Sequence, residues 1–396
     1  MGEDMEQQVK EFESLAELLE DLDREGITGY ARKRLVDQFM MMRARVLRKP
    51  YTASFELTPL CNLDCKMCYV HLRNDQLGQE SILSTEEWIE ILQQAIDAGI
   101  MHADLTGGEC LTHPGFKQIY LYLIARGVKV AILTNGQLLS EKMVAFLSKY
   151  PPSVIQITVY GSCNEAYEKV TGKPAFPDVI QGIELAKRAG LNVRLVVTPN
   201  RYMQGDEEQL LNVLREIGVR YDIGSASLPP RPETGRAYNN FLMDTAVYAH
   251  MLKLDSEHRT AKNPARLPDY PEFKFRVRGM EQVKGLPCAA GTGAFHVNWK
   301  GEMTPCIPFY TIAHSVKNGQ LMEAWKWISD EVRTYSVAEQ CQTCEHRTIC
   351  KTCTAEKTAC VLNGTVNHYV CERLQKLIDL GLIEPSSDDC GYEGEI

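Results

Sequence analysis

The chain has 396 residues, which allow two or three domains or one large domain with an extension, and its 44% hydrophobic and 24% charged residues are enough for a packed core. Its 43 basic and 52 acidic residues give a net charge of −9, which argues against nucleic acid as a partner because phosphate contacts need a basic surface. No segment approaches the roughly 18 uninterrupted apolar residues of a membrane span. Residues 1–20 resemble neither a signal peptide nor a transit peptide. We therefore expect a cytoplasmic protein with no membrane contact.

The cysteines are the most informative residue type. There are fourteen, and nine of them lie between Cys288 and Cys390. The cytosol keeps thiols reduced, so closely spaced cysteines in a chain without an export signal indicate metal ligands rather than disulfides.

Residues 1–50 are predicted to form an N-terminal helical extension. Leucines recur at helical spacing from Leu15 to Leu22, and a second helix is expected from about Tyr30 to Arg48. The segment is interpreted as all-helical, without a hairpin signal. The two helices either pack on the main body or dock a partner.

Residues 51–227 alternate between strand-like and helical segments. The expected strands are Thr52–Leu57, His102–Thr106, Val128–Leu133, Val154–Val159, Asn192–Thr198 and Val219–Gly224. The expected helices are Thr85–Ala98, Phe116–Ala125, Glu141–Lys149, Val179–Ala189 and Glu207–Ile217. Such alternation predicts an α/β fold with a parallel sheet, whose chemistry lies at the carboxyl ends of the strands. Six repeats, not eight, favour a partial (β/α)6 TIM-like barrel.

Three further regions follow the repeats. A bridging region, 228–285, opens with Pro229, Pro230 and Pro232. A cysteine-rich domain is expected over 286–375, and a polar C-terminal tail over 376–396.

The first cysteine motif directly follows the first strand. Cys61, Cys65 and Cys68 have the spacing C-x3-C-x2-C, which places three thiolates within eight residues. A structural zinc site would need a fourth ligand, and only His71, separated from Cys68 by two residues, is near. Three cysteines suit a cubane iron–sulfur cluster with one iron open to a small molecule.

A second motif, Gly107-Gly108-Glu109, ends the second strand. Two glycines let a ligand approach the backbone closely, and a carboxylate can pair with an ammonium group. The sequence alone therefore indicates a ligand site beside the cysteine loop.

Together, the cysteine spacing, the repeats and the Gly-Gly-Glu resemble the radical S-adenosylmethionine (SAM) superfamily. The resemblance implies that Cys61, Cys65 and Cys68 are the catalytic ligands of a SAM-binding [4Fe-4S] cluster, and that Glu109 binds the methionyl amine. It implies further SAM contacts at Tyr69, Gly107, Gly108, Thr134, Asn135 and Thr158. Relatives often have Pro where this chain has Cys110, and an Arg where it has Tyr167–Gly172. Lys169 or Arg194 could take over the contact to the SAM carboxylate.

The second cysteine set lies near the C-terminus and comprises Cys288, Cys306, Cys341, Cys344, Cys350, Cys353 and Cys371. A zinc ribbon explains only the C-x2-C pairs, which sit too close together for one. The set resembles the SPASM extension, which implies two auxiliary iron–sulfur clusters.

The family pattern assigns one auxiliary cluster to Cys341, Cys344, Cys350 and Cys371. It assigns Cys288, Cys306 and Cys353 to the other, whose fourth ligand is Cys360, a substrate atom or water. Three further thiols, at Cys110, Cys163 and Cys390, are interpreted as ordinary free cysteines.

The resemblance implies an enzyme that cleaves SAM reductively and oxidatively modifies a ribosomally made peptide, forming a thioether or another crosslink. Its expected partners are a leader-bearing peptide and a reductant such as flavodoxin or ferredoxin. The N-terminal segment is too short for a winged-helix leader-binding module, so the leader would dock on the helical pair or on a separate protein. The alternatives are oxidation of a protein side chain, as in sulfatase maturases, a small-metabolite substrate, and a non-enzymatic electron carrier.

Overall fold

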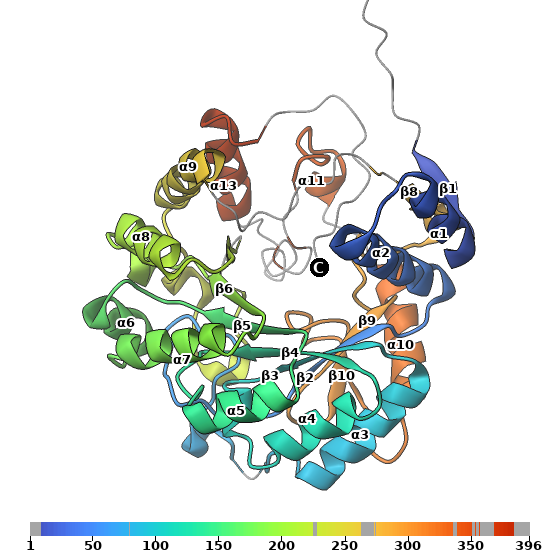
Figure 1. The fold of residues 1–396 in the computed structure, drawn as a ribbon, viewed down its shortest axis with the longest axis horizontal. Helices are drawn as coiled ribbons and strands as arrows, with labels where there is room; N and C mark the ends of the chain where they lie inside the picture. Colours follow the sequence, from blue (N-terminus) through green and yellow to red (C-terminus); the bar gives the residue numbers. More distant parts are fainter. Residues whose placement is uncertain are drawn as a thin grey trace, which may run out of the picture.

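The computed structural model describes residues 9–78, 80–224, 228–262, 273, 275–335, 339–350, 353, 356 and 368–383 (Figure 1). It shows an α/β fold built on one mostly parallel sheet, with strand order β11-β10-β9-β2-β3-β4-β5-β6-β7. The predicted α/β class is therefore confirmed.

Six parallel strands form the centre of the sheet in chain order. They are β2 (Thr52–Glu56), β3 (His102–Thr106), β4 (Lys129–Thr134), β5 (Val154–Thr158), β6 (Val193–Val197) and β7 (Tyr221–Ile223). All six coincide with predicted strands to within two residues at either end. Three later strands extend the β2 edge: β9 (Ala294–Val297) pairs parallel to β2, and β10 (Glu302–Thr304) and β11 (His314–Ser315) follow antiparallel.

Helices connect the parallel strands, and Figure 1 shows them along one side of the sheet. They are α3 (Thr85–Ala98), α4 (Phe116–Ile124), α5 (Glu141–Lys149), α6 (Asn164–Thr171), α7 (Phe176–Arg188) and α8 (Glu207–Ile217). In α3, Ser84 and Glu87 form a reciprocal capping box, and Gly99 ends the helix with a φ of 106°. Helix α6 was not predicted, because its eight residues are too few for a clear apolar period.

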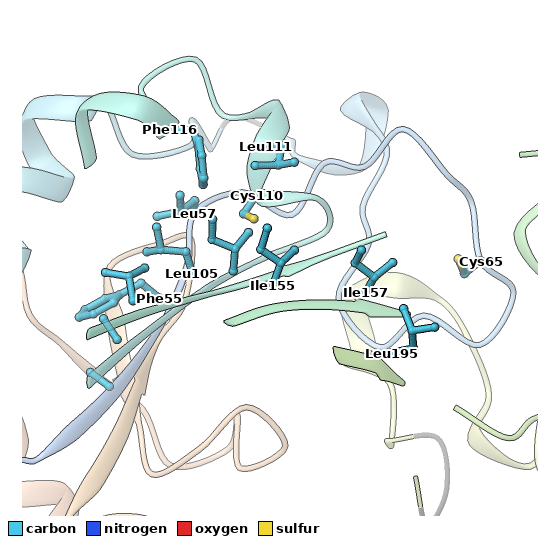
Figure 2. Packing of buried hydrophobic residues seen from close by; sticks show 14 of the residues in the cluster. Phe55, Leu57, Cys65, Leu105, Cys110, Leu111, Phe116, Ile155, Ile157 and Leu195 are labelled. Atoms are coloured by element: carbon cyan, nitrogen blue, oxygen red, sulfur yellow. The ribbon is translucent and has the colours of Figure 1, made fainter. Parts of the chain in front are cut away.

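The two faces of the central strands have different character. Phe55, Leu57 and Leu105 point toward the helices and form the core with Ile155 and Ile157 (Figure 2). Since side chains alternate along a strand, the intervening residues of β2 and β3 lie on the opposite face. That inner face carries polar groups.

The N-terminal segment contains a strand as well as helices. β1 (Lys10–Phe12) pairs parallel to β8 (Phe275–Val277), and α1 (Leu15–Arg24) and α2 (Gly29–Leu47) follow it. The all-helical prediction is thus wrong at Lys10–Phe12, since β1 depends on a partner strand far along the chain. The predicted helices are present, and α2 contacts the main body through an ion pair between Asp37 and Lys129, 3.0 Å apart.

The remaining helices come from the second half of the chain. They are α9 (Thr245–Lys262), α10 (Leu321–Thr334), α11 (Glu339–Gln342) and α13 (His368–Asp379). Short 3-10 turns occur at Asn74–Gln76, Cys110–Thr112, Arg201–Met203, Pro232–Thr234, Tyr238–Asn240 and Met280–Gln282. In the described part of the chain, no helix has the length and apolar character to cross a membrane. The domain limits drawn from the sequence remain predictions.

Phe295 joins the late strands to the core and offers a stability test. It is 2% exposed and stands edge-on to Phe55, with ring centroids 6.2 Å apart. Phe295→Ala leaves a cavity, so we expect the free energy of unfolding to fall by about 3–5 kcal/mol. Chemical denaturation measures this. Met322→Ala, at a side chain on α10 that is 51% exposed, is the control and should change it by about 0.5 kcal/mol or less. Equal effects of the two variants would contradict the packing described.

Candidate active site

The cysteine loop begins where β2 ends and presents three thiols to backbone and side-chain donors. Cys65 is buried, and Cys61 and Cys68 are half-buried. The amide of Leu63 donates to the Cys61 sulfur at 3.4 Å, and the amide of His71 donates to the Cys68 sulfur at 3.2 Å. Such donors stabilise thiolate ligands of iron–sulfur clusters.

The three thiols influence one another's pKa. Burial raises the pKa of Cys61 to about 12, and the Cys68 thiolate adds to the rise. Burial also raises the pKa of Cys65, with further contributions from Cys68 and Cys61. A nearby cation reverses this balance and ionises such thiols. Among the described residues, no three His, Cys, Asp or Glu side chains lie close enough to share a single metal ion.

The Gly-Gly-Glu turn lies directly against the cysteine loop. The Gly108 amide donates to the Thr58 carbonyl at 2.7 Å, and the Glu109 amide donates to the Leu60 carbonyl at 2.9 Å. A Cβ on Gly108 would stand 2.4 Å from the Leu60 oxygen, and one on Gly107 would stand 2.5 Å from the Thr58 oxygen. The sequence argument had these glycines making room for a ligand. In the structure, the group that requires their small size is the backbone of the cysteine loop.

Glu109 is 1% exposed and held from several directions. The Thr134 hydroxyl lies 2.9 and 2.8 Å from its two carboxylate oxygens, and the amides of Asn135 and Leu111 donate to it at 2.8 and 3.0 Å. Burial raises the pKa of Glu109, and these donors oppose the rise. Thr134 ends β4, so the neighbouring strand holds this carboxylate in place.

Hydrogen bonds connect the carboxylate to the cysteine loop. The Asn135 side-chain amide donates to the Asn62 oxygen at 2.7 Å and lies 3.7 Å from the Cys61 sulfur. Asn62 in turn donates to Gln137 at 2.6 Å. Cys61, Glu109, Thr134 and Asn135 are thus brought into one network, and their contact with a cofactor stays a prediction.

The other candidate SAM contacts come from the cysteine loop, from β5, from β6 and from α6. Tyr69 follows the last loop cysteine, and Thr158 ends β5. Arg194, on β6, is already engaged, since its Nε lies 2.5 Å from the Asp222 carboxylate. Lys169, the other proposed carboxylate ligand, lies exposed on α6.

A sequence profile of the radical SAM superfamily matches residues 55–216, which contain the loop, the turn and this network. This part of the chain is a radical SAM domain. The predicted family membership is therefore confirmed.

Curated relatives of this radical SAM chain act on different substrates. The antilisterial bacteriocin subtilosin biosynthesis protein AlbA of Bacillus subtilis is 26% identical over 269 residues, covering 66% of this chain and 55% of AlbA. The chain therefore matches only about half of AlbA's length. AdoMet-dependent heme synthase of Methanosarcina barkeri is 25% identical over 333 residues, 78% of this chain and 93% of that protein.

A solved structure supports the fold. Streptococcus suis SuiB bound to the precursor peptide SuiA superposes with a TM-score of 0.59 at 15% identity, covering 87% of each chain. At this identity the similarity establishes the α/β fold of the radical SAM chain and nothing about its substrate.

Two functional neighbours of the loop escaped sequence analysis. The Tyr160 hydroxyl hydrogen-bonds the Cys65 thiol and lowers that thiol's pKa, against the larger effect of burial. Arg236 also lowers the pKa of Cys65 and Cys68 by its charge. Tyr160 lies two residues beyond the carboxyl end of the parallel strand β5, and this position was the one available signal. Nothing in the spacing identified Arg236.

On the inner face of the sheet, Glu56 forms a buried ion pair. Both terminal nitrogens of Arg231 donate to its carboxylate, at 2.8 and 2.6 Å, and His296 lies 3.4 Å away. Because the pair is bidentate and buried, it fixes the position of the strand end from which the cysteine loop starts.

The C-terminal cysteines fall partly within the described residues. The thiols of Cys288 and Cys353 act on that of Cys306: burial raises the pKa of Cys306, and the charges of Cys353 and Cys288 raise it further. The other proposed set comprises Cys341, Cys344 and Cys350, all half-buried, and Cys371 at an exposed position on α13. Cys360 and Cys390 lie outside the described residues.

Two cysteines outside these sets are placed by the structure. Cys110 is a buried thiol in the core, 3.4 Å from the Leu133 carbonyl. This matches its interpretation as an ordinary buried thiol. Cys163 is half-buried at the start of α6.

Asp104 is an inner-face carboxylate with no partner among the described residues. In the sheet it pairs with Ser54, and this pair lies two residues before the pair of Glu56 and Thr106 on the same face. Burial is the only cause that shifts its pKa, which rises to about 6. Once ionised, an unpaired carboxylate at this position lowers the free energy of unfolding. Such groups occur chiefly at functional sites.

This cost gives a pH-dependent prediction. The pKa of Asp104 in the folded state, about 6, lies above its ordinary value of 3.8. The folded state therefore holds this proton more tightly than the unfolded state, and the free energy of unfolding falls as the pH rises from 4 through 6. Asp104→Asn removes the titration. We expect it to raise the free energy of unfolding at pH 7.5 by roughly 2 kcal/mol and to change it little at pH 4. Denaturation at the two pH values measures the difference, with Asp97→Asn on the exposed side of α3 as control; a gain that is equal at both would contradict the assignment.

Proposed function

We propose that this radical SAM enzyme cleaves SAM reductively and uses the resulting radical to oxidise a ribosomally made peptide. The observation that carries the proposal is the Asn135–Asn62 bond, which connects a buried carboxylate to a loop of three clustered thiols. When bound to Cys61, Cys65 and Cys68, a [4Fe-4S] cluster supplies the electron that splits SAM into methionine and a 5′-deoxyadenosyl radical. The chain's own residues bind, orient and shield these partners.

The donor chemistry of the loop suits such a cluster. Three thiols share one loop, backbone amides donate to two of the sulfurs, and the Tyr160 hydroxyl donates to the third. Three protein ligands leave one position for a small molecule. We infer that Glu109 accepts the methionyl ammonium of SAM there, since a positive charge relieves the penalty of ionising a buried carboxylate. Thr134 and the Asn135 amide hold the carboxylate while this happens.

We further propose that the central strands form a partial (β/α)6 barrel and that residues 286–375 form a SPASM-type domain. Six parallel strands with a polar inner face support the barrel. The grouping of Cys288, Cys306 and Cys353 supports one of two auxiliary clusters, with Cys341, Cys344, Cys350 and Cys371 for the other. Auxiliary clusters would accept the electron that leaves the substrate radical. Tyr69, Gly107, Gly108, Thr158 and Arg194 stay as proposed SAM contacts.

A peptide is the substrate class we favour. AlbA acts in bacteriocin biosynthesis, and SuiB was solved with its precursor peptide. The heme synthase supports the second candidate, a small-molecule substrate, because it matches this chain over most of both sequences. A leader peptide and a reductant such as flavodoxin or ferredoxin complete the proposed partners. We also propose a cytoplasmic location, where thiols stay reduced and can bind clusters.

The central test is anaerobic cleavage of SAM. Reconstituted protein with dithionite and SAM should yield 5′-deoxyadenosine, measured by chromatography, and Cys61→Ala/Cys65→Ala/Cys68→Ala should yield none. The triple variant should also bind about four fewer irons, because a cubane cluster holds four. Cys163→Ala is the control and should retain both properties. Undiminished cleavage by the triple variant would refute the site.

The auxiliary role predicts a different pattern. Cys371→Ala should lose one auxiliary cluster by iron count, keep SAM cleavage and lose product formation on the cognate peptide. The reason is that radical generation needs only the first cluster, whereas oxidation needs an electron acceptor. Mass spectrometry of candidate precursor peptides measures the product. An unchanged product yield would show that this cluster has no part in oxidation.

A further inference from the structure

The start of the bridging region lies along the cysteine loop. We call Arg231–Arg236 the clamp segment. The Arg231 amide donates to the Tyr69 carbonyl at 3.1 Å, while its guanidinium pairs with Glu56 at the base of the loop. At the other end, Arg236 donates to the His71 carbonyl at 3.1 Å. The segment therefore contacts the loop's base and the residues that follow its last cysteine.

Arg236 also contacts the middle of the loop. Its second terminal nitrogen donates to the Asp64 carboxylate at 2.8 Å, one residue before Cys65. The Arg236 side chain is 16% exposed and the Asp64 side chain 52% exposed, so the guanidinium lies against the protein while the carboxylate faces solvent. The same Asp64 oxygen lies 3.2 Å from the His71 ring. One guanidinium thus joins residues on both sides of Cys65 and Cys68.

The backbone of the clamp segment folds into a hydrogen-bonded turn. Pro232–Thr234 form a 3-10 turn, the Thr234 hydroxyl donates to the Arg231 carbonyl at 2.7 Å, and the Gly235 amide donates to the Pro232 carbonyl at 3.0 Å. Gly235 has a φ of 65°, which a side chain would strain. The two arginines are consequently held at a fixed separation along the loop.

We propose that Arg236 is a positioning residue which holds the cysteine loop in its cluster-binding shape and, by its charge, raises the reduction potential of the cluster. This rests on the proposed function, since it concerns the cluster on Cys61, Cys65 and Cys68. A fixed positive charge stabilises the more negative, reduced state of a nearby cluster. The two hydrogen bonds to Asp64 and His71 restrain the loop whether or not the cluster is reduced.

The experiment separates geometry from charge with three variants of the full chain. Arg236→Gln removes the charge, and Arg236→Lys keeps the charge but lacks the planar two-armed contact. Arg126→Gln, which removes an exposed arginine in the turn after α4, is the control. Iron release to a chelator is followed for each. The potential is read from the electron paramagnetic resonance signal that changes on SAM addition, and the triple cysteine variant provides the background.

Arg236→Gln should release the loop's iron roughly tenfold faster, because one charge-assisted hydrogen bond contributes about that factor. The same variant should shift the reduction potential of the cluster to more negative values. Arg236→Lys should release iron faster yet keep a potential near that of the wild type, and Arg126→Gln should match the wild type in both. A wild-type potential in Arg236→Gln, or wild-type iron retention, would overturn the proposal. Wild-type protein that binds no more iron than the triple cysteine variant would instead refute the cluster site itself.

Discussion

The structure depends on the direct contact between two backbones, the Gly-Gly-Glu turn and the start of the cysteine loop. Amides of Gly108 and Glu109 donate to carbonyls of Thr58 and Leu60, and no side chain fits between the segments. Because adjacent parallel strands carry the two segments, the distance from Glu109 to the thiols is set by strand register rather than by flexible side chains. A cofactor bridging a carboxylate and a metal cluster requires such a fixed distance.

The polar inner face of the sheet follows from the same arrangement. A strand that buries Phe55 and Leu57 against helices must turn Glu56 to the opposite side. Arg231 stabilises Glu56 there, because the bidentate ion pair offsets the free-energy cost of burying the Glu56 carboxylate. Asp104 has no such partner and lowers stability instead. One ion-paired carboxylate and one unpaired carboxylate on this face are expected where a protein binds polar groups of a substrate. Enzymes lose some stability at such positions in return for function.

Sequence analysis was accurate where the signal is local. The six central strands were predicted because each is a short apolar run between glycine-ended helices, and the cysteine motif needs only spacing to be identified. β1 was missed because three residues become a strand only beside β8. Asp104 and Tyr160 were missed for a related reason, since their importance arises from which face they occupy. The role of Gly107 and Gly108 was attributed to a ligand, because a sequence does not show that another backbone lies against them.

The charges around the loop explain why the bridging region contributes to the site. The loop's surroundings are acidic in the functional state: three thiols that must ionise, Glu56 at the base and Glu109 beside them. So many anionic groups in a buried place oppose the transfer of a further electron to a cluster bound there. Lys173 donates to the Asn62 carbonyl within the loop at 2.7 Å, and two further cations, Arg231 and Arg236, come from the segment that follows the sixth repeat. A proline-rich segment outside the six repeats therefore adds positive charge to the surroundings of the cysteine loop, and its contacts with Glu56 and Asp64 explain why it is ordered there.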